Sequence, residues 1–220
     1  ARRCNECAAD LIRSYPSRFG GFASLPLPDV DAALEELTYA LDVLKLDGVV
    51  LLTNFVGLYL GDSRFDALFD ELQRRKAVVF VHPTVCPDQT HNLGQASRAL
   101  DFLVDTSKAI LNLHYSKTFA RTPDVKYIFS HAGGMLPYIV GRLTLLAAQH
   151  KVDEDGDQSI ADCLRQLYYD TATAFFDPVL HTLRAVVGLE RVVFGTDFPM
   201  VRRNESVTWR QRLEESSELN

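Results

Sequence analysis

Short apolar runs alternate with longer segments of helical periodicity along most of the chain. Residues 77–82, for example, read AVVFVH and follow a segment with apolar residues at helical spacing. Strands that are apolar on both faces and are separated by helices pair in parallel, so this alternation predicts an α/β fold built on a parallel sheet. Six strands are expected, near residues 22–25, 48–53, 77–82, 125–130, 167–171 and 191–196.

Helices are expected between these strands. One begins on Ser63, and another has Pro178 in its first turn and Gly188 at its end. The expected helices cover residues 5–15, 29–45, 63–76, 95–119, 135–150, 158–167 and 177–188, with part of 202–220. No repeat, low-complexity segment or linker divides the chain, so residues 1–220 are predicted to form one domain.

Charge and hydropathy exclude several classes of partner. The formal net charge of -6 provides no basic surface for nucleic acid. No apolar run approaches the ~20 residues that cross a bilayer. The first ten residues, ARRCNECAAD, are too polar for a signal peptide. We therefore expect a cytoplasmic protein that binds neither nucleic acid nor membranes.

The cysteines do not indicate a zinc or redox site. Cys4 and Cys7 form a lone C-x-x-C, whereas a structural zinc site normally needs a second such pair. A thioredoxin-type pair follows a strand, and no strand is expected before this one. Cys4 and Cys7 are therefore interpreted as ordinary thiols on a helix.

Three of the expected strands lead into side chains that bind metals well. His82, His131 and Asp197 each close an apolar run, and Asp170 holds a similar place on the strand between the last two. The carboxyl ends of parallel strands lie at one edge of the sheet, so these groups are expected to converge. Imidazole and carboxylate together suit Zn²⁺, Mn²⁺ or Fe²⁺.

A structural role is the alternative for each of these residues. A single histidine at a strand end is usually a hydrogen-bonded structural residue. An aspartate after the run VVFGT, however, is costly to bury without a partner or a metal. Three such endings in one chain favour a functional site.

Other polar residues are weaker candidates. Thr53 and Asn54 end a strand and could line the same pocket, and His91 lies in a loop that could reach it. Gly133 and Gly134 belong to no phosphate-binding motif. The remaining histidines fall on expected helices and are interpreted as surface residues: His114, His150 and His181.

Four stretches of the chain resemble a known family. VFVHPT, FSHAGG, YYDTA and VVFGTDFPM are similar to motifs of the amidohydrolase-related metal-dependent decarboxylases. These include the aminocarboxymuconate semialdehyde, γ-resorcylate and 6-methylsalicylate decarboxylases. RFGGFASLPLPDVDAALEEL and LDGVVLLTN are similar to earlier strands of that group, so the resemblance covers nearly all of residues 1–200.

The resemblance implies a fold and a site. The family fold is a TIM-like (β/α)₈ barrel with one divalent metal at its mouth, here Zn²⁺ or Mn²⁺. His82 and Asp197 match metal ligands, and His131 matches the catalytic histidine beside the metal. Asp170 matches no residue of assigned role. The family also implies a homodimer.

One departure from the family pattern is large. Members begin with a strand that ends in His-x-His or Glu-x-His, and neither motif occurs near the start here. Together with the count of six strands, this predicts a barrel that lacks its first two strands and part of its C-terminus. Two protein ligands hold a metal poorly and an open sheet exposes its edges. We expect weak metal binding, little activity and a tendency to associate.

The implied reaction is the non-oxidative decarboxylation of a small aromatic (salicylate-type) or unsaturated carboxylic acid. His131 or Asp197 would deliver a proton to the carbon that loses CO₂. Two alternatives stay open: a metal-dependent hydrolase of a lactone or cyclic amide, in which His131 helps to activate water, and a non-catalytic fragment. The exact acid and the choice between zinc and manganese are not determined by the sequence.

Overall fold

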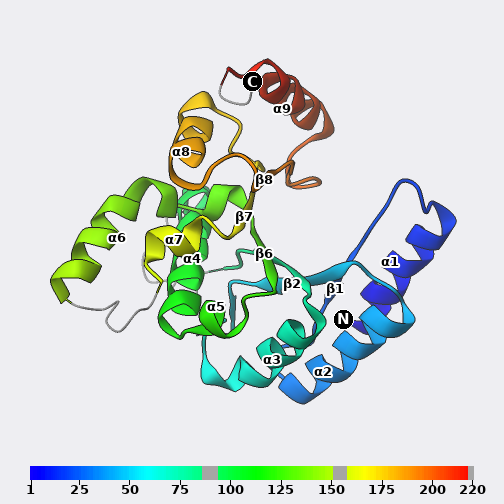
Figure 1. Cartoon of the computed structure of the whole chain (residues 1–220). Helices are drawn as coiled ribbons and strands as arrows, with labels where there is room; N and C mark the ends of the chain where they lie inside the picture. Colours follow the sequence, from blue (N-terminus) through cyan, green and yellow to red (C-terminus); the bar gives the residue numbers. More distant parts are fainter. Residues whose placement is uncertain (86–93, 151–157, 218–220) are drawn as a thin grey trace.

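A parallel sheet forms the centre of the molecule (Figure 1). The computed structural model describes residues 1–85, 94–150 and 158–217. The strand order is β1-β2-β5-β6-β7-β8, and every neighbouring pair is parallel. The strands are β1 (Phe22–Ser24), β2 (Gly48–Leu52), β5 (Val78–His82), β6 (Lys126–Phe129), β7 (Tyr168–Asp170) and β8 (Val192–Val193), and a separate hairpin consists of β3 (Asn54–Phe55) and β4 (Leu58–Tyr59). The six predicted strands are confirmed.

Helices precede, connect and follow the parallel strands (Figure 1). They are α1 (Arg2–Ser14), α2 (Val30–Thr38), α3 (Asp66–Arg75), α4 (Gln95–Tyr115), α5 (Thr118–Arg121), α6 (Leu136–His150), α7 (Ile160–Leu164), α8 (Asp177–Val187) and α9 (Arg203–Glu215). This order confirms the predicted α/β class. Among the described helices, none is long and apolar enough to cross a membrane.

The two faces of the sheet differ in burial. The face that packs against helices, called the outer face, consists of Val49, Leu51, Val79, Val81, Tyr127, Phe129 and Tyr169, all buried. Apolar residues of the helices complete this core, among them Leu37, Leu72, Leu113 and Leu183. The opposite face, called the inner face, consists of Phe22, Val50, Phe80, His82, Ile128, Ser130 and Asp170, and its apolar members are half-buried or exposed. The alternation of side chains along each strand produces this division.

The sheet is open in the part of the chain that the structure describes. β1 and β8 stand at the two ends of the strand order, so each pairs on one side. This agrees with the expectation that two sheet edges are exposed.

The side chains of Thr53 and Asn54 bind a buried carboxylate next to the β3–β4 hairpin and do not line a pocket. Asp105 of α4 is 1% exposed and accepts a hydrogen bond from the Thr53 hydroxyl. It also accepts hydrogen bonds from Asn54 Nδ2 at 3.0 Å and from the Tyr59 hydroxyl at 2.6 Å. The prediction that Thr53 and Asn54 line the pocket is wrong, because a buried carboxylate on α4 takes up both side chains.

Two predicted helices are interrupted. Residues 95–119 form α4 and α5, separated at Lys117, whose φ of +64° is left-handed. A 2.8 Å hydrogen bond between the hydroxyls of Ser116 and Thr118 stabilises this break. Residues 29–45 begin as α2 and continue as a π-helical turn, Tyr39–Val43. In both cases the apolar periodicity continues across the interruption, so the sequence pattern does not reveal it.

Candidate metal centre

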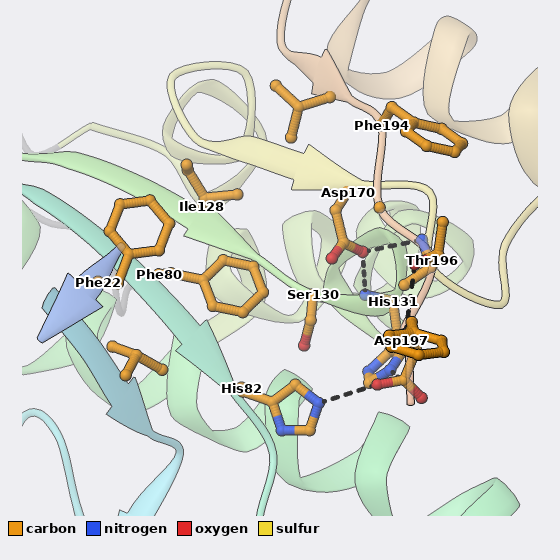
Figure 2. A pocket seen from close by; sticks show the side chains of 15 residues that line it. Phe22, Phe80, His82, Ile128, Ser130, His131, Asp170, Phe194, Thr196 and Asp197 are labelled. Atoms are coloured by element: carbon orange, nitrogen blue, oxygen red, sulfur yellow. Dashed lines mark hydrogen bonds and ion pairs between the residues drawn. The ribbon is translucent and has the colours of Figure 1, made fainter. Parts of the chain in front are cut away.

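The carboxyl ends of β5, β6 and β8 bring two histidines and an aspartate together (Figure 2). His82 Nε2 lies 3.5 Å from Asp197 Oδ1, and His131 Nε2 lies 3.7 Å from Asp197 Oδ2. The centroids of the two imidazole rings are 5.2 Å apart. One potential ligand atom from each of the three residues lies within 4.8 Å of the others. The predicted convergence of His82, His131 and Asp197 is therefore confirmed.

Two of these residues have a strained backbone. His131 has a φ of +53°, the next residue, Ala132, has +57°, and Asp197 has +58°. A left-handed conformation costs a residue with a side chain about 1–2 kcal/mol. Such strain persists where the surrounding structure holds it, and it concentrates at functional sites.

The tautomer of His82 favours metal ligation. Its Nδ1 lies 2.8 Å from the carbonyl oxygen of Pro83, which can only accept, so Nδ1 carries the proton. Nε2 then presents a lone pair toward Asp197. A ligating histidine usually donates its other ring N–H to a carbonyl or carboxylate, so His82 fits the role of a ligand.

The imidazole of His131 is favoured in its neutral form. Its side chain is 6% exposed, and burial lowers its pKa, with the neighbouring His82 adding to this effect and Asp197 opposing it. Within the described residues, His131 Nδ1 and the Ser130 hydroxyl are buried without a hydrogen-bond partner. Two imidazoles and one carboxylate form a donor set that suits a divalent metal ion.

The carboxylate of Asp170 lies next to the backbone of His131 and is not one of the converging ligand groups (Figure 2). Its Oδ1 accepts the backbone N–H of His131 at 2.8 Å and that of Ala172 at 3.0 Å. Burial raises the pKa of Asp170 to about 6, although both hydrogen bonds lower it.

The centre opens into a cleft of about 500 Å³ on the inner face of the sheet. Aromatic and aliphatic side chains form most of its wall, and Phe22 stacks on Phe80 with ring centroids 6.1 Å apart. Polar groups of the centre lie at one end. The lining residues include Phe22, Val50, Phe80, Ile128, Ser130, Val193, Phe194 and Phe198. An amphiphilic ligand with an apolar body and one polar end matches this arrangement.

A family model described as Amidohydrolase (Amidohydro_2) matches residues 1–219. The chain belongs to this amidohydrolase family. It is 38% identical over 212 residues to the decarboxylase yanB of Aspergillus niger, covering 90% of this chain and 58% of that protein. It is 34% identical over 226 residues to the 6-methylsalicylic acid decarboxylase acuB of Aspergillus aculeatus, covering 99% and 68%.

Solved structures of amidohydrolases show the same fold. An amidohydrolase II structure superposes with a TM-score of 0.91 at 28% identity, covering 99% of this chain and 70% of that one. A 2,6-dihydroxybenzoate decarboxylase solved with 2,6-dihydroxybenzoate gives 0.84 at 25% identity, covering 96% and 69%. A dihydroxybenzoic acid decarboxylase of Polaromonas, solved with bound manganese, gives 0.82 at 25% identity, covering 99% and 70%. The described sheet and its helices thus correspond to part of a TIM-like barrel.

The chain spans less than two thirds of the length of several curated amidohydrolase relatives, including 58% of yanB and 63% of the 6-methylsalicylic acid decarboxylase of Penicillium expansum. The predicted family is confirmed by these matches. The predicted loss of two strands and of C-terminal structure stays a prediction.

The weaker candidates from the sequence lie outside the metal centre or have a structural explanation. His114 is buried at 9% exposure, so its interpretation as a surface residue is wrong, because α4 packs that side chain inside. His181 is exposed on α8, as expected, and His91 lies outside the described residues. Gly133 has a φ of +74°, and a Cβ there would lie 2.6 Å from the Tyr169 ring, which explains this glycine without a phosphate.

Ser130 is the site residue that motif reasoning missed. Strand register pairs Phe80 with Ile128, so Ser130 follows one inward position later, beside His82. Ser130 lines the cleft. The register of two adjacent strands could have indicated it, because residues two positions apart on a strand share a face.

Proposed function

We propose that this chain forms part of the active site of a metal-dependent decarboxylase that removes CO₂, without oxidation, from a small aromatic acid of the salicylate type. The observation that supports it most directly is the convergence of His82, His131 and Asp197. A fungal relative is named as a 6-methylsalicylic acid decarboxylase, and a structural neighbour is named as a 2,6-dihydroxybenzoate decarboxylase. Both names support an aromatic acid as the substrate.

His82 and Asp197 are the proposed metal ligands, with His131 beside them. A divalent ion, Mn²⁺ or Zn²⁺, would anchor the carboxylate of the acid and stabilise the negative charge that develops as CO₂ leaves. Manganese in the Polaromonas structure supports Mn²⁺ as the first ion to test. The lone pair on His82 Nε2 and the carboxylate of Asp197 support the assignment of these two ligands.

The proposed reaction needs one proton. The bond between the ring carbon and the carboxyl carbon breaks, its electron pair stays on the ring carbon, and a proton takes the place of CO₂. His131 and Asp197 are the proposed proton-delivering residues. Burial lowers the pKa of His131, so its imidazole is favoured in the neutral form, which can accept a proton and pass it on.

Product analysis tests this function. The chain is incubated with Mn²⁺ and a hydroxybenzoic acid in water labelled with ¹⁸O, and CO₂ and the aromatic product are measured. We expect equimolar CO₂ and decarboxylated phenol with no ¹⁸O in the phenol, lost in His131→Ala and Asp197→Ala and kept in His181→Ala. A ¹⁸O-containing product from a lactone or cyclic amide would instead support a hydrolase. No turnover of either substrate class by the metal-loaded chain would support a non-catalytic fragment.

Metal binding is tested separately by calorimetry. Because His82 and Asp197 supply two ligands and catalytic metal sites normally have three, we expect weak binding, with a dissociation constant above about 1 μM. Sub-micromolar binding of Mn²⁺ or Zn²⁺ at a single site would contradict this expectation.

Three further properties belong to the same proposal. We propose that residues 1–220 form one domain, that the protein associates as a homodimer and that it acts in the cytoplasm. The implied association of family members and the open sheet edges support self-association. Sedimentation velocity at two concentrations tests the dimer, and a fluorescent fusion tests the location.

A further inference from the structure

We propose that Asp170 and Thr171, at the end of β7, are positioning residues that set His131 and Asp197 at their mutual distance. Asp170 holds the main chain of His131, and Thr171 holds the main chain two residues before Asp197. This inference deepens the proposed function and rests on it for its catalytic meaning, but the contacts themselves do not depend on metal or substrate.

Asp170 fixes the strained turn that carries His131. The backbone N–H of His131, at a φ of +53°, donates to Asp170 Oδ1 over 2.8 Å. The same oxygen accepts the N–H of Ala172 at 3.0 Å, which ties the carboxylate to its own strand end. The Asp170 side chain is 6% exposed, so water does not compete strongly for these bonds. Without the acceptor, a buried N–H would be left unpaired beside the strained turn.

Thr171 fixes the segment that carries Asp197. Its hydroxyl accepts the backbone N–H of Gly195 at 3.2 Å and donates to the carbonyl oxygen of Gly195 at 3.3 Å. The backbone N–H of Thr171 also donates to the carbonyl oxygen of Val193 at 3.1 Å. This reciprocal pair continues the contact between β7 and β8 past the last paired residues, and Asp197 follows two residues later.

Gly195 joins the two halves of this arrangement. A Cβ on Gly195 would lie 2.7 Å from Asp170 Oδ2 and 2.8 Å from its Cγ. The Gly195 backbone therefore packs directly on the carboxylate that holds His131. Asp170 is confined between the N–H groups on one side and the Gly195 backbone on the other, and Figure 2 shows this carboxylate between the two chain segments.

The hydrogen-bond pattern allows a positioning role of Asp170 to be distinguished from a role of its negative charge. Both donors bind Asp170 Oδ1, so the amide oxygen of an asparagine can accept them equally. Asp170→Asn should therefore preserve the arrangement, whereas Asp170→Ala removes the acceptor. In the same way Thr171→Ser keeps a hydroxyl, and Thr171→Val removes it at almost constant volume.

The test uses the full chain without metal and follows the two imidazole rings by NMR. The His82 and His131 ring signals are assigned with His82→Gln and His131→Gln variants, and the nuclear Overhauser effect between the rings is measured. The rings are 5.2 Å apart, so the wild-type chain should show it. We expect Asp170→Asn to retain the effect and Asp170→Ala to lose most of it. Both Thr171 variants should retain it, because Thr171 holds the segment of Asp197 and neither ring.

Binding of Co²⁺, followed by visible absorption, is the second readout. Loss of residues that orient ligands costs about 10- to 100-fold in metal affinity, which is the decrease expected for Asp170→Ala and Thr171→Val. Near-wild-type ring contacts in folded Asp170→Ala, or near-wild-type Co²⁺ affinity in folded Thr171→Val, would overturn the proposal. So would equal loss in Asp170→Asn and Asp170→Ala, since the charge would then be the decisive property.

The design keeps this inference separate from the proposed function. If the wild-type chain shows no decarboxylation, the metal-free ring contacts still decide whether Asp170 positions His131, and Co²⁺ affinity decides whether Thr171 positions Asp197. If Asp170→Ala does not fold, as judged by near-ultraviolet circular dichroism, the Co²⁺ affinities of Thr171→Val and Thr171→Ser decide the proposal.

Discussion

The outer and inner faces of the same sheet have different roles in this molecule. Phe129 on the outer face is fully buried against helices, while Phe80, on the adjacent strand and the inner face, is half-buried at the cleft. The outer face is apolar along the strands. The inner face changes at the strand ends to His82, Ser130 and Asp170. This difference indicates that the outer face, which packs on helices, stabilises the fold, and that the inner face is available for the residues of the site.

Backbone strain occurs at the site as well as in turns such as those of Val56 and Lys117. Left-handed non-glycine residues at the centre include His131 and Asp197, which belong to the site and not to the outer core. Stability is therefore given up where the geometry of the site requires it.

The largest expected effect tests this division with a matched pair of aromatic residues. Phe129→Ala should lower the free energy of unfolding by about 3–5 kcal/mol, because it leaves a cavity in the core. Phe80→Ala should cost less than half as much, since its side chain already faces the cleft. Urea denaturation measures both. Equal losses would mean that the inner face contributes as much to stability as the outer face.

The second prediction concerns pH and Asp170. Burial raises the pKa of Asp170 to about 6, from an ordinary value of 3.8, so the folded state keeps this proton to a higher pH than the unfolded chain. The stability of the wild type should thus fall relative to Asp170→Asn as pH rises from about 4 to about 6, by ~3 kcal/mol, and then stay constant.

Urea denaturation at pH 4, 5, 6 and 7 measures this difference, with Asp31→Asn on the exposed side of α2 as the control. The burial of His131 has the opposite effect on the pH dependence of stability. Because its pKa is lowered in the folded state, stability rises with pH up to about 6.5. The effect of His131 on stability is the same in both proteins and cancels in the comparison. A constant difference across the range would contradict the prediction.

The third prediction separates stability from metal binding. Asp197→Gly should reduce Mn²⁺ affinity about 100-fold, because the carboxylate shared by both imidazoles is lost. The same change should leave the free energy of unfolding unchanged or raise it by about 1 kcal/mol, because glycine adopts a φ of +58° without strain. Calorimetry and urea denaturation measure the two effects. A large loss of stability would indicate that Asp197 is structural.

The smallest effect is expected at strain that lies outside both faces. Val56, at the tip of the β3–β4 hairpin, is 90% exposed and has a φ of +53°, followed by Gly57 at +84°. Val56→Asn should raise stability by about 1 kcal/mol, because asparagine tolerates the left-handed turn that valine does not. Thermal unfolding measures the gain, and Mn²⁺ binding should not change. A decrease in stability would mean that the valine makes a contact that offsets its strain.

Much of the fold and the centre of the site could be predicted from the chain alone. Apolar runs define parallel strands locally, and parallel strands bring their carboxyl ends to one edge whatever the details of packing. For that reason the positions of the six strands and the convergence of His82, His131 and Asp197 followed from sequence position. The amidohydrolase family followed from the motifs around the same residues.

The tertiary structure decided what depends on contacts between distant side chains. Asp105 binds Thr53 from 52 positions away, which removes Thr53 from the pocket, and His114 is buried because of the way α4 packs. Asp170 reaches His131 over 39 positions. Such hydrogen bonds leave no periodic pattern in the sequence, because each depends on the distance and angle between two elements that only folding brings together.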